Sequence, residues 1–236
     1  MSDERVQRRA RLRERMEAKY PDLRLTDTQL DNYLDAQDRS AGQPTDPVPH
    51  VGKISVHRAT PDRLGDVLDF FDHRAFAGNP GWGACYCMYH HLGRDMVPAW
   101  EERTWQDNRR ELTRRIQDEE TRGYVAYDGD KVVGWLNASR RSSFPDHATG
   151  EDNGIASMVC FTVAPSHRGH GIGRRLLETA IDELSATGTQ RIEAYPVPDH
   201  VSDAAAYRGR EKLFLEHGFG FVEGAEAPTV SRNSTR

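Results

Sequence analysis

The sequence predicts an α/β fold, in which strands and amphipathic helices alternate over most of its 236 residues. Two observations support this class. An apolar, strand-like run at 155–161 leads through a glycine-rich turn into a helical pattern at 173–186. Two further runs, 124–127 and 132–138, flank the segment 128–130 (Asp-Gly-Asp), which is typical of a hairpin turn.

The other elements follow from local patterns of apolar residues, caps and breakers. Before the hairpin, we expect a strand at 54–58, a helix opening at Thr60-Pro61-Asp62, and a second helix opening at Pro98 with Trp105, Leu112 and Ile116 on one stripe. After the hairpin, we expect a strand at 155–163, the helix 173–186, a strand at 191–195, a helix at 203–217 ended by Gly218, and strands at 219–222 and 229–231.

The first 50 residues differ in character from the rest. Residues 3–18 are rich in Arg and Glu and predict one helix, and Thr26 followed by Gln29 resembles a capping box that opens a second. Residues 39–52 contain three prolines and two glycines and predict a linker. We therefore expect a helical extension with its linker at 1–50 and the main domain at 53–232. The extension is too small to bury a core of its own, so it should pack on the main domain or on another subunit.

Composition excludes several classes of function. The net charge of −5 argues against a general nucleic-acid-binding protein, and the arginines near the N-terminus are interleaved with acids, as on a solvated helix face. No apolar run approaches the roughly 18 residues of a membrane span, and the N-terminus lacks the apolar core of a secretory signal. Three cysteines fit a reducing compartment, so we expect a cytoplasmic protein.

The segment 163–177, VAPSHRGHGIGRRLL, is the most informative part of the chain. Three glycines between a strand and a helix present backbone N–H groups and the positive end of the helix dipole to one point, where an anion such as a pyrophosphate can bind. A Walker loop would need Gly-Lys-Ser/Thr, where this chain has Gly173-Arg174-Arg175. A Rossmann fingerprint would need wider spacing than that of Gly171 and Gly173.

This segment resembles the V-x-P-x-x-R-G-x-G-[IV]-G-x-x-L loop of the GNAT acyltransferases, and the order of elements from 53 to 232 is similar to theirs. The resemblance implies a mixed central sheet flanked by helices, with the short helical extension added at the N-terminus. It also implies that acetyl-CoA is the cosubstrate. The residues matched to its binding are Phe161, Thr162, Val163, Arg168, Gly169, His170, Gly171, Ile172, Gly173 and Arg174.

Acetyl transfer to an amine also requires groups that move a proton. Glu193 is the acidic residue nearest the expected site end of its strand and is a candidate base, the alternative being a carboxylate on the strand's outer face. Glu151 and Asp152 are weaker candidates for this role. In the family, a tyrosine four residues before the Gly of a Gly-Phe pair often protonates the leaving thiolate.

That tyrosine position is Phe214 in this chain. Tyr207, seven residues earlier on the same expected helix, and Tyr195 are the candidate acids instead. Because of its displaced position, Tyr207 is expected to matter less than Glu193 or Tyr195.

The segment 81–91, GWGACYCMYHH, belongs to the acceptor side of the site by the same resemblance. Cys85, Tyr86, Cys87 and Tyr89 are therefore candidate substrate contacts in an aromatic pocket, with core packing as the alternative. Two cysteines two residues apart would face the same side of a strand. A metal site is not expected, because no second ligand pair follows at structural-zinc spacing.

Three functions stay open at this point. The first is acetyl transfer from acetyl-CoA to a primary amine of a small molecule, by direct attack on the thioester. The second is acetyl transfer to a protein or peptide amine, with the N-terminal helices as a docking element. The third is a non-catalytic acyl-CoA-binding module. The sequence names neither the acceptor nor the oligomeric state, and a homodimer is left open.

Overall fold

The computed structural model of the chain describes residues 3–93, 97–148, 154–202, 205–225 and 227–234. Within these residues a single mixed sheet has the strand order β1-β2-β3-β4-β5-β7-β6, and only the β4–β5 pair is parallel. The strands are β1 (Ile54–Arg58), β2 (Gly123–Asp128), β3 (Lys131–Arg140), β4 (Ile155–Val163), β5 (Arg191–Ala194), β6 (Gly220–Phe221) and β7 (Val230–Asn233).

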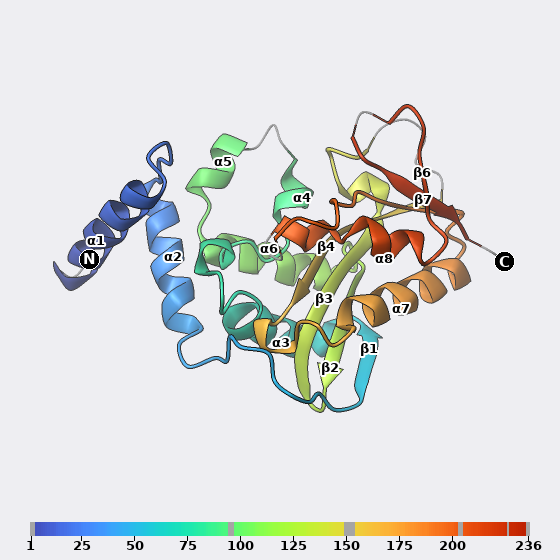
Figure 1. The fold of residues 1–236 in the computed structure, drawn as a ribbon, viewed down its shortest axis with the longest axis horizontal. Coiled ribbons are helices and arrows are strands. Elements are labelled where there is room, and N and C mark those ends of the chain that lie inside the picture. Colours follow the sequence, from blue (N-terminus) through green and yellow to red (C-terminus); the bar gives the residue numbers. More distant parts are fainter. Residues whose placement is uncertain (1–2, 94–96, 149–153, 203–204, 226, 235–236) are drawn as a thin grey trace.

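Helices lie on both faces of this sheet (Figure 1). They are α1 (Asp3–Lys19), α2 (Asp27–Arg39), α3 (Leu64–Asp69), α4 (Tyr89–Leu92), α5 (Val97–Glu102), α6 (Trp105–Gln117), α7 (Ile172–Ala186) and α8 (Glu211–Leu215). The α/β class, the hairpin of β2 and β3 and the strand–loop–helix unit of β4 and α7 are thus confirmed. No helix of the described residues is both long and apolar enough to cross a lipid bilayer.

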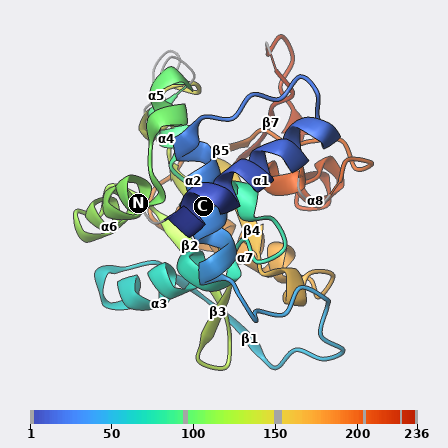
Figure 2. The same ribbon diagram turned by 90° about the vertical axis from the view of Figure 1, so that its left-hand side faces the viewer.

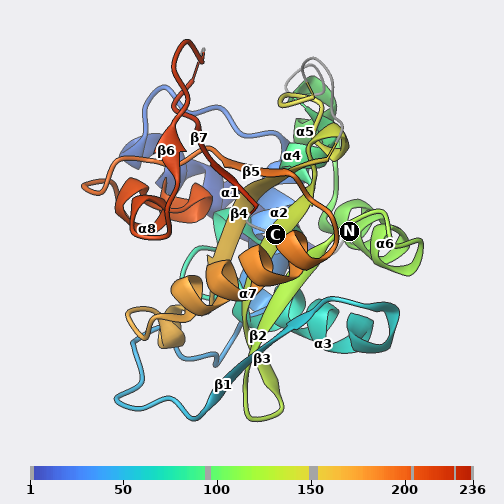
Figure 3. The same cartoon turned by 90° about the vertical axis from the view of Figure 1, so that its right-hand side faces the viewer.

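Two apolar clusters hold the sheet between its helices. On one face α7 crosses β1, β2 and β3 and packs its inward residues, such as Leu176 and Leu177, against them (Figure 3). On the other face Trp135 of β3 lies fully buried among side chains of α3 and α6, including Val67 and Leu112. Both faces of the central strands are therefore covered, which explains why β3 reads as a nearly continuous buried run.

The central feature of the sheet is the separation of β4 from β5. These strands pair from Ile155 with Arg191 to Met158 with Ala194, where β5 ends. β4 continues for five more residues, to Val163, while keeping its pairs with β3. From Val159 onward, the backbone edge of β4 that faces away from β3 therefore pairs with no strand in the described part of the chain. An extended ligand can bond to that edge.

Two expected helices are wrong in their extent. The helix expected to run on from Pro98 is interrupted before Trp105, because Thr104 opens α6 with a capping box to Asp107. The helix expected at 203–217 is also interrupted. It consists of a 3₁₀ turn at Ala205–Arg208 and the separate helix α8, with Gly209 between them at φ +82°. The Phe214 ring would lie 2.6 Å from a Cβ at Gly209, so only glycine fits this break.

The N-terminal extension forms two paired helices, as expected, and the capping box of Thr26 and Gln29 is present. Arginines of α1 face aspartates of α2 along the pair, for example Arg5 with Asp35 at 2.7 Å, and Arg8 with Asp38 at 2.6 Å. Four of the arginines of α1, namely Arg5, Arg8, Arg9 and Arg13, are therefore paired within the extension. Leu12, Leu30 and Leu34 form a small core between the helices.

The extension packs on the main domain of the same chain (Figure 2). Asn32 donates from Nδ2 to the Arg103 carbonyl and accepts from the Trp105 N–H, each at 2.9 Å. The Arg39 guanidinium lies 3.9 Å from the ring centre of Trp105 and donates to the Gly83 carbonyl at 3.1 Å. These contacts fix α2 beside the segment that joins α5 to α6.

We expect a chain that begins at Gly52 to keep the fold of the main domain. Neither large apolar cluster contains a buried residue from positions 1–50. Leu12, Leu30 and Leu34, which form the small core, all belong to the extension and are removed together with it. Thermal unfolding followed by circular dichroism should show one cooperative transition at a lowered melting temperature. A broad transition with no near-ultraviolet signal would show instead that the extension completes the core.

Candidate active site

The loop between β4 and α7 has the geometry of an anion site. Gly169 and Gly171 adopt left-handed φ angles of +80° and +73°, and no atom lies within 4 Å of a Cβ built at either position. Gly171 is the N-cap of α7, and no side chain caps this helix end. The N–H groups of the first turn, at Ile172 and Gly173, are therefore directed to the space in front of the loop, together with the positive end of the helix dipole.

A first cavity of about 440 Å³ lies in front of this loop and along the free edge of β4. Eight of the ten residues predicted to bind the cosubstrate line it, namely Phe161, Thr162, Val163, Arg168, Gly169, Gly171, Ile172 and Gly173. The other two lie outside its lining. His170 bonds through Nδ1 to the Arg168 carbonyl at 2.9 Å, and Arg174 pairs with Glu216 near α8.

A second cavity, of about 420 Å³, adjoins the first and includes Cys160 and Thr162 of β4 in its lining. Its walls come from distant parts of the chain: the extension supplies Met16, Leu25, Gln29, Asn32 and Tyr33, and the region before and within α6 supplies Trp100, Arg103 and Asn108. The predicted acceptor segment supplies Cys85, Cys87 and Tyr89. Phe76, Trp82, Thr162 and Tyr207 line both cavities, so the two meet at these residues.

Tyr207 stands at this junction because the predicted helix is interrupted. The 3₁₀ turn that carries it packs against β4, and its ring centre lies 5.1 Å from that of Trp82 and 5.9 Å from that of His90. Burial raises the pKa of the Tyr207 phenol, so the hydroxyl is protonated at neutral pH. A protonated hydroxyl placed where two cavities meet can serve both as a hydrogen-bond donor and as a proton carrier.

Phe214, at the position of the family tyrosine, does not face either cavity. It is fully buried and packs edge-on against Phe161 and Phe219, with ring centres 5.9 and 5.2 Å away. Its ring belongs to the apolar cluster that also contains the inward residues of α7, and it fills the space beside Gly209. A hydroxyl at this position would be buried away from the junction, which Tyr207 occupies instead.

Glu193 is buried rather than on the outer face of its strand. Its carboxylate accepts from Arg191 at 2.7 Å and from Arg141 at 3.4 Å, and the Tyr195 hydroxyl lies 3.5 Å away. Tyr195 is also buried, and its hydroxyl lies 2.9 Å from the Ser157 hydroxyl. Neither residue lines either cavity. Glu193 is paired with Ser157 next to the end of β5, and Tyr195 directly follows Ala194, the last paired residue of that strand.

A stack of rings connects Tyr195 with the second cavity. The Tyr195 ring is parallel to that of His147 with centres 3.6 Å apart, and His147 is stacked on His90 at 6.2 Å. His90 lines the cavity. Glu151 and Asp152, the weaker candidates for the base, lie outside the described residues.

The segment of residues 85–89 is not a strand. Tyr86 and Cys87 adopt left-handed φ angles of +45° and +59°, so the chain turns sharply there and sends successive side chains in different directions. Tyr86 points into the core, where its hydroxyl donates to Asp72 at 2.5 Å. Cys85, Cys87 and Tyr89 face the second cavity, whereas Tyr86, the fourth predicted contact, does not.

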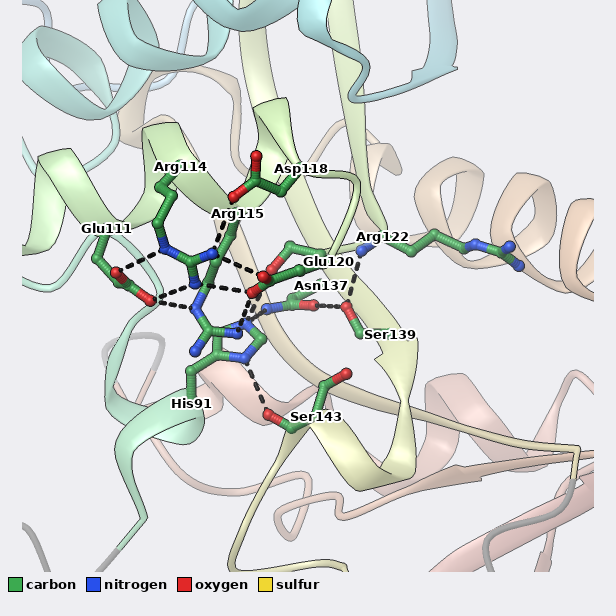
Figure 4. Close-up of polar contacts among 11 residues, drawn as sticks. His91, Glu111, Arg114, Arg115, Asp118, Glu120, Arg122, Asn137, Ser139 and Ser143 are labelled. Atoms are coloured by element: carbon green, nitrogen blue, oxygen red, sulfur yellow. Dashed lines mark hydrogen bonds and ion pairs between the residues drawn. The ribbon is translucent and has the colours of Figure 1, made fainter.

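A polar network behind β3 holds this turn in place (Figure 4). Asn137 of β3 donates from Nδ2 to His91 Nε2 at 2.9 Å and lies 3.3 Å from the Cys87 sulfur. His91 Nδ1 lies 3.0 Å from the Ser143 carbonyl, which can only accept, so the proton is on Nδ1. Burial lowers the pKa of His91 to about 3, so this ring is neutral and structural.

His90 is a cavity residue that the sequence analysis did not single out. It is buried, and its Nε2 has no hydrogen-bond partner within the described structure. Burial, together with the nearby His147, lowers the pKa of His90 to about 4, so the ring is neutral at pH 7. His90 and His91 are adjacent in the sequence, and no periodic pattern shows which of the two lines the cavity and which is structural. Among the described residues, no group of three or more His, Cys, Asp or Glu side chains is placed to hold a metal ion.

Comparisons with known proteins show the family to which this chain belongs. The family model described as the acetyltransferase (GNAT) family matches residues 86–210, which is more than half of the chain. The mycothiol acetyltransferase of Beutenbergia cavernae is 32% identical over 134 residues, which are 57% of this chain and 36% of that protein. This chain thus spans little more than a third of the length of that relative.

Two solved structures are also similar to this chain. An acetyltransferase of Thermus thermophilus is 20% identical, with a TM-score of 0.45 over 78% of this chain and 99% of the other. The PaiA N-acetyltransferase of Thermoplasma acidophilum, solved in complex with coenzyme A, is 13% identical, with a TM-score of 0.46 over 77% and 99%. On the family match, this chain belongs to the GNAT acetyltransferases, enzymes that take their acetyl group from acetyl-CoA.

Proposed function

We propose that this protein transfers the acetyl group of acetyl-CoA directly to a primary amine of a small molecule. The observation that carries the proposal is the meeting of two cavities at Thr162 and Tyr207. The first cavity contains the glycine loop and the free edge of β4, where a pyrophosphate and a pantetheine arm fit. The second is then left for the acceptor, with its amine at the junction.

The shape of the second cavity supports a small acceptor. Gln29, Asn32 and Tyr33 of α2 line it together with Cys85 and Cys160, so the extension encloses part of this space. Its volume of about 420 Å³ falls in the range of pockets for small ligands, roughly 300–1,000 Å³. One chain supplies all of these walls, so the proposal needs no second subunit.

The chemistry moves one proton from nitrogen to sulfur. The neutral amine attacks the thioester carbonyl, the C–N bond forms, the C–S bond breaks, and the nitrogen loses the proton that the sulfur gains. Tyr207 is placed to carry this proton, because its raised pKa keeps it protonated and it borders both cavities. Thioester and amine held at one junction gain further rate from proximity alone.

Release of free thiol from acetyl-CoA, measured across a panel of amines, amino acids and short peptides, tests the proposal. We expect turnover with at least one small amine and none with peptides. Turnover with peptides alone would make the protein a peptide acetyltransferase. Binding of acetyl-CoA without turnover of any panel member would make it a non-catalytic acyl-CoA-binding module.

Glu193 and Tyr195 stay candidates for the groups that set the pH dependence of the rate. Because neither lines a cavity, each would have to act on the reacting groups through water. If Glu193 is the base, Glu193→Gln lowers kcat/KM by about 10²–10⁴ with little change in CoA affinity. The same change also removes the buried carboxylate that pairs with Arg141 and Arg191 and should cost about 2 kcal/mol of stability. Activity must therefore be measured well below the melting temperature of the variant.

The profile of rate against pH separates the two roles. A change in that profile in Glu193→Gln or Tyr195→Phe supports a catalytic role. Wild-type profiles in both variants, with only the stability lowered, would assign Glu193 and Tyr195 to the support of the strand. Proton transfer would then run through Tyr207, water or the substrate.

We also propose a cytoplasmic location. Cys85, Cys87 and Cys160 all line the second cavity, and all three are free thiols rather than disulfides. Free thiols gathered in one place persist in a reducing compartment. Acetyl-CoA, the donor on which the proposed reaction depends, must be present in the same compartment.

A further inference from the structure

The second cavity has an unusual distribution of charge. Among the described residues that line it, Arg103 is the only Lys or Arg, and there is no Asp or Glu. His90, the other basic residue of the lining, is kept neutral by burial. A cavity with this lining gives an ammonium group no carboxylate partner but offers a guanidinium to an anion.

A hydrogen bond to Asn108 holds the Arg103 side chain in place. Its Nε donates to Asn108 Oδ1 at 2.7 Å, and Asn108, which is 1% exposed, is fixed by a 2.7 Å bond from its Nδ2 to the Ala84 carbonyl. Asn32 of α2 holds the backbone at Arg103 from the other side. Within the described residues, the two terminal nitrogens of Arg103 have no hydrogen-bond acceptor and no carboxylate partner.

Six aromatic side chains also line this cavity. Tyr89 and Trp100 meet edge to face at 5.4 Å, and Trp82 and Tyr207 lie 5.1 Å apart; Tyr33 and Phe76 complete the group. Such walls favour an apolar or aromatic side chain over a hydrated polar one. Three different surfaces therefore surround one small space: an apolar wall, an anchored guanidinium, and the junction with the thioester.

We propose that the acceptor is an apolar or aromatic α-amino acid, whose carboxylate binds Arg103 and whose α-amine lies at the junction beside Tyr207. This inference rests on the proposed function and specifies its substrate class. The lack of an acidic lining residue fits this acceptor, because the amino acid brings its own carboxylate to Arg103. The extension then takes part in recognition, since Asn32 positions Arg103.

The test compares acceptors that differ only in the carboxylate. L-phenylalanine is paired with 2-phenylethylamine, and L-leucine with 3-methylbutylamine, and kcat/KM is measured for each with saturating acetyl-CoA. We expect the amino acid to be favoured by at least about tenfold in each pair. Arg103→Gln should reduce this preference by about 10- to 100-fold, mainly through KM of the amino acid, because it removes a charge-assisted hydrogen-bond pair.

Arg110→Gln is the matched control, since Arg110 is exposed on α6, pairs with Asp107 and lines neither cavity. It should keep the wild-type preference. Calorimetry of L-phenylalanine with the CoA-loaded protein gives a second readout, and Arg103→Gln should weaken that binding by a similar factor. Melting temperatures confirm that both variants are folded.

The outcomes separate this inference from the proposed function. Equal turnover of both members of each pair, a preference for the plain amine, or an unchanged preference in a folded Arg103→Gln variant overturns the assignment of Arg103. Turnover of other panel amines, with none of these four, overturns the α-amino acid class and leaves small-amine acetylation standing. Tight acetyl-CoA binding without turnover of any amine overturns both.

Discussion

Gly171→Glu is expected to lower the affinity for CoA by at least about 100-fold. Gly171 caps α7 with a left-handed φ of +73°, and its backbone borders the space where the pyrophosphate would lie. A glutamate there adds a side chain and a negative charge beside two phosphates, and like charges in contact cost several kcal/mol. The measurement is calorimetric titration of the folded variant with CoA.

Gly188→Glu is the control for this change. Gly188 has a similar φ of +83°, is also exposed, and has no atom within 4 Å of a built Cβ, but it follows the C-terminal end of α7. Both substitutions should cost about 1–2 kcal/mol of backbone strain, so their stabilities should be comparable. Only Gly171→Glu should lose CoA binding. Equal CoA affinity in the two variants would remove the glycine loop from the cosubstrate site.

Tyr207→Phe is expected to lower kcat by about 10²-fold or more, with little change in CoA affinity. The hydroxyl is the group at the junction that can carry the proton to the leaving sulfur, and phenylalanine keeps the packing on Trp82 and His90 without it. The sequence predicts a smaller effect for Tyr207 than for Glu193 or Tyr195, because it places Tyr207 seven residues from the family position on one continuous helix. Because that helix is interrupted at Gly209, the displacement in sequence is not a displacement in space.

Tyr127→Phe controls for the loss of a hydroxyl elsewhere, since Tyr127 donates to Asp66 at 2.8 Å and lines neither cavity. It should lower stability and leave kcat near wild type. The pH profile adds a check on Tyr207. Its pKa is raised above the ordinary value of about 10, so the required protonated form persists below that pH and is lost only above it. A decline of wild-type kcat at about pH 7–9 that is absent in Tyr207→Phe would contradict this assignment.

Much of the cosubstrate side could be predicted from sequence, because it depends on local rules. A glycine loop between a strand and a helix fixes the donors by backbone geometry, and eight of ten predicted residues line the first cavity. His170 and Arg174 are not among the lining residues, because their side chains bond to neighbours, and their part in cosubstrate binding stays a prediction. The motif gives the backbone path but not the direction of each side chain.

The acceptor side could be predicted only in part, because it depends on contacts between distant segments. No local pattern shows that Asn32 lies beside Arg103, 71 residues later. The sequence pattern also gave no sign of the sharp bend at Tyr86 and Cys87, which adopt left-handed φ angles although neither is glycine. The interruption before Trp105, by contrast, had a readable signal in the capping pattern from Thr104 to Asp107.

The central claim is that one acetyl group passes directly from acetyl-CoA, across the junction at Tyr207, to a small amine. Isotopically labelled acetyl-CoA is incubated with the protein and the amine panel, and mass spectrometry follows the label in the amines and in the intact protein. We predict labelled acetyl-amine as the product and an unlabelled protein at every time point. A label that passes first onto the protein, for example onto one of the three thiols lining the acceptor cavity, or that never leaves CoA, would contradict the account.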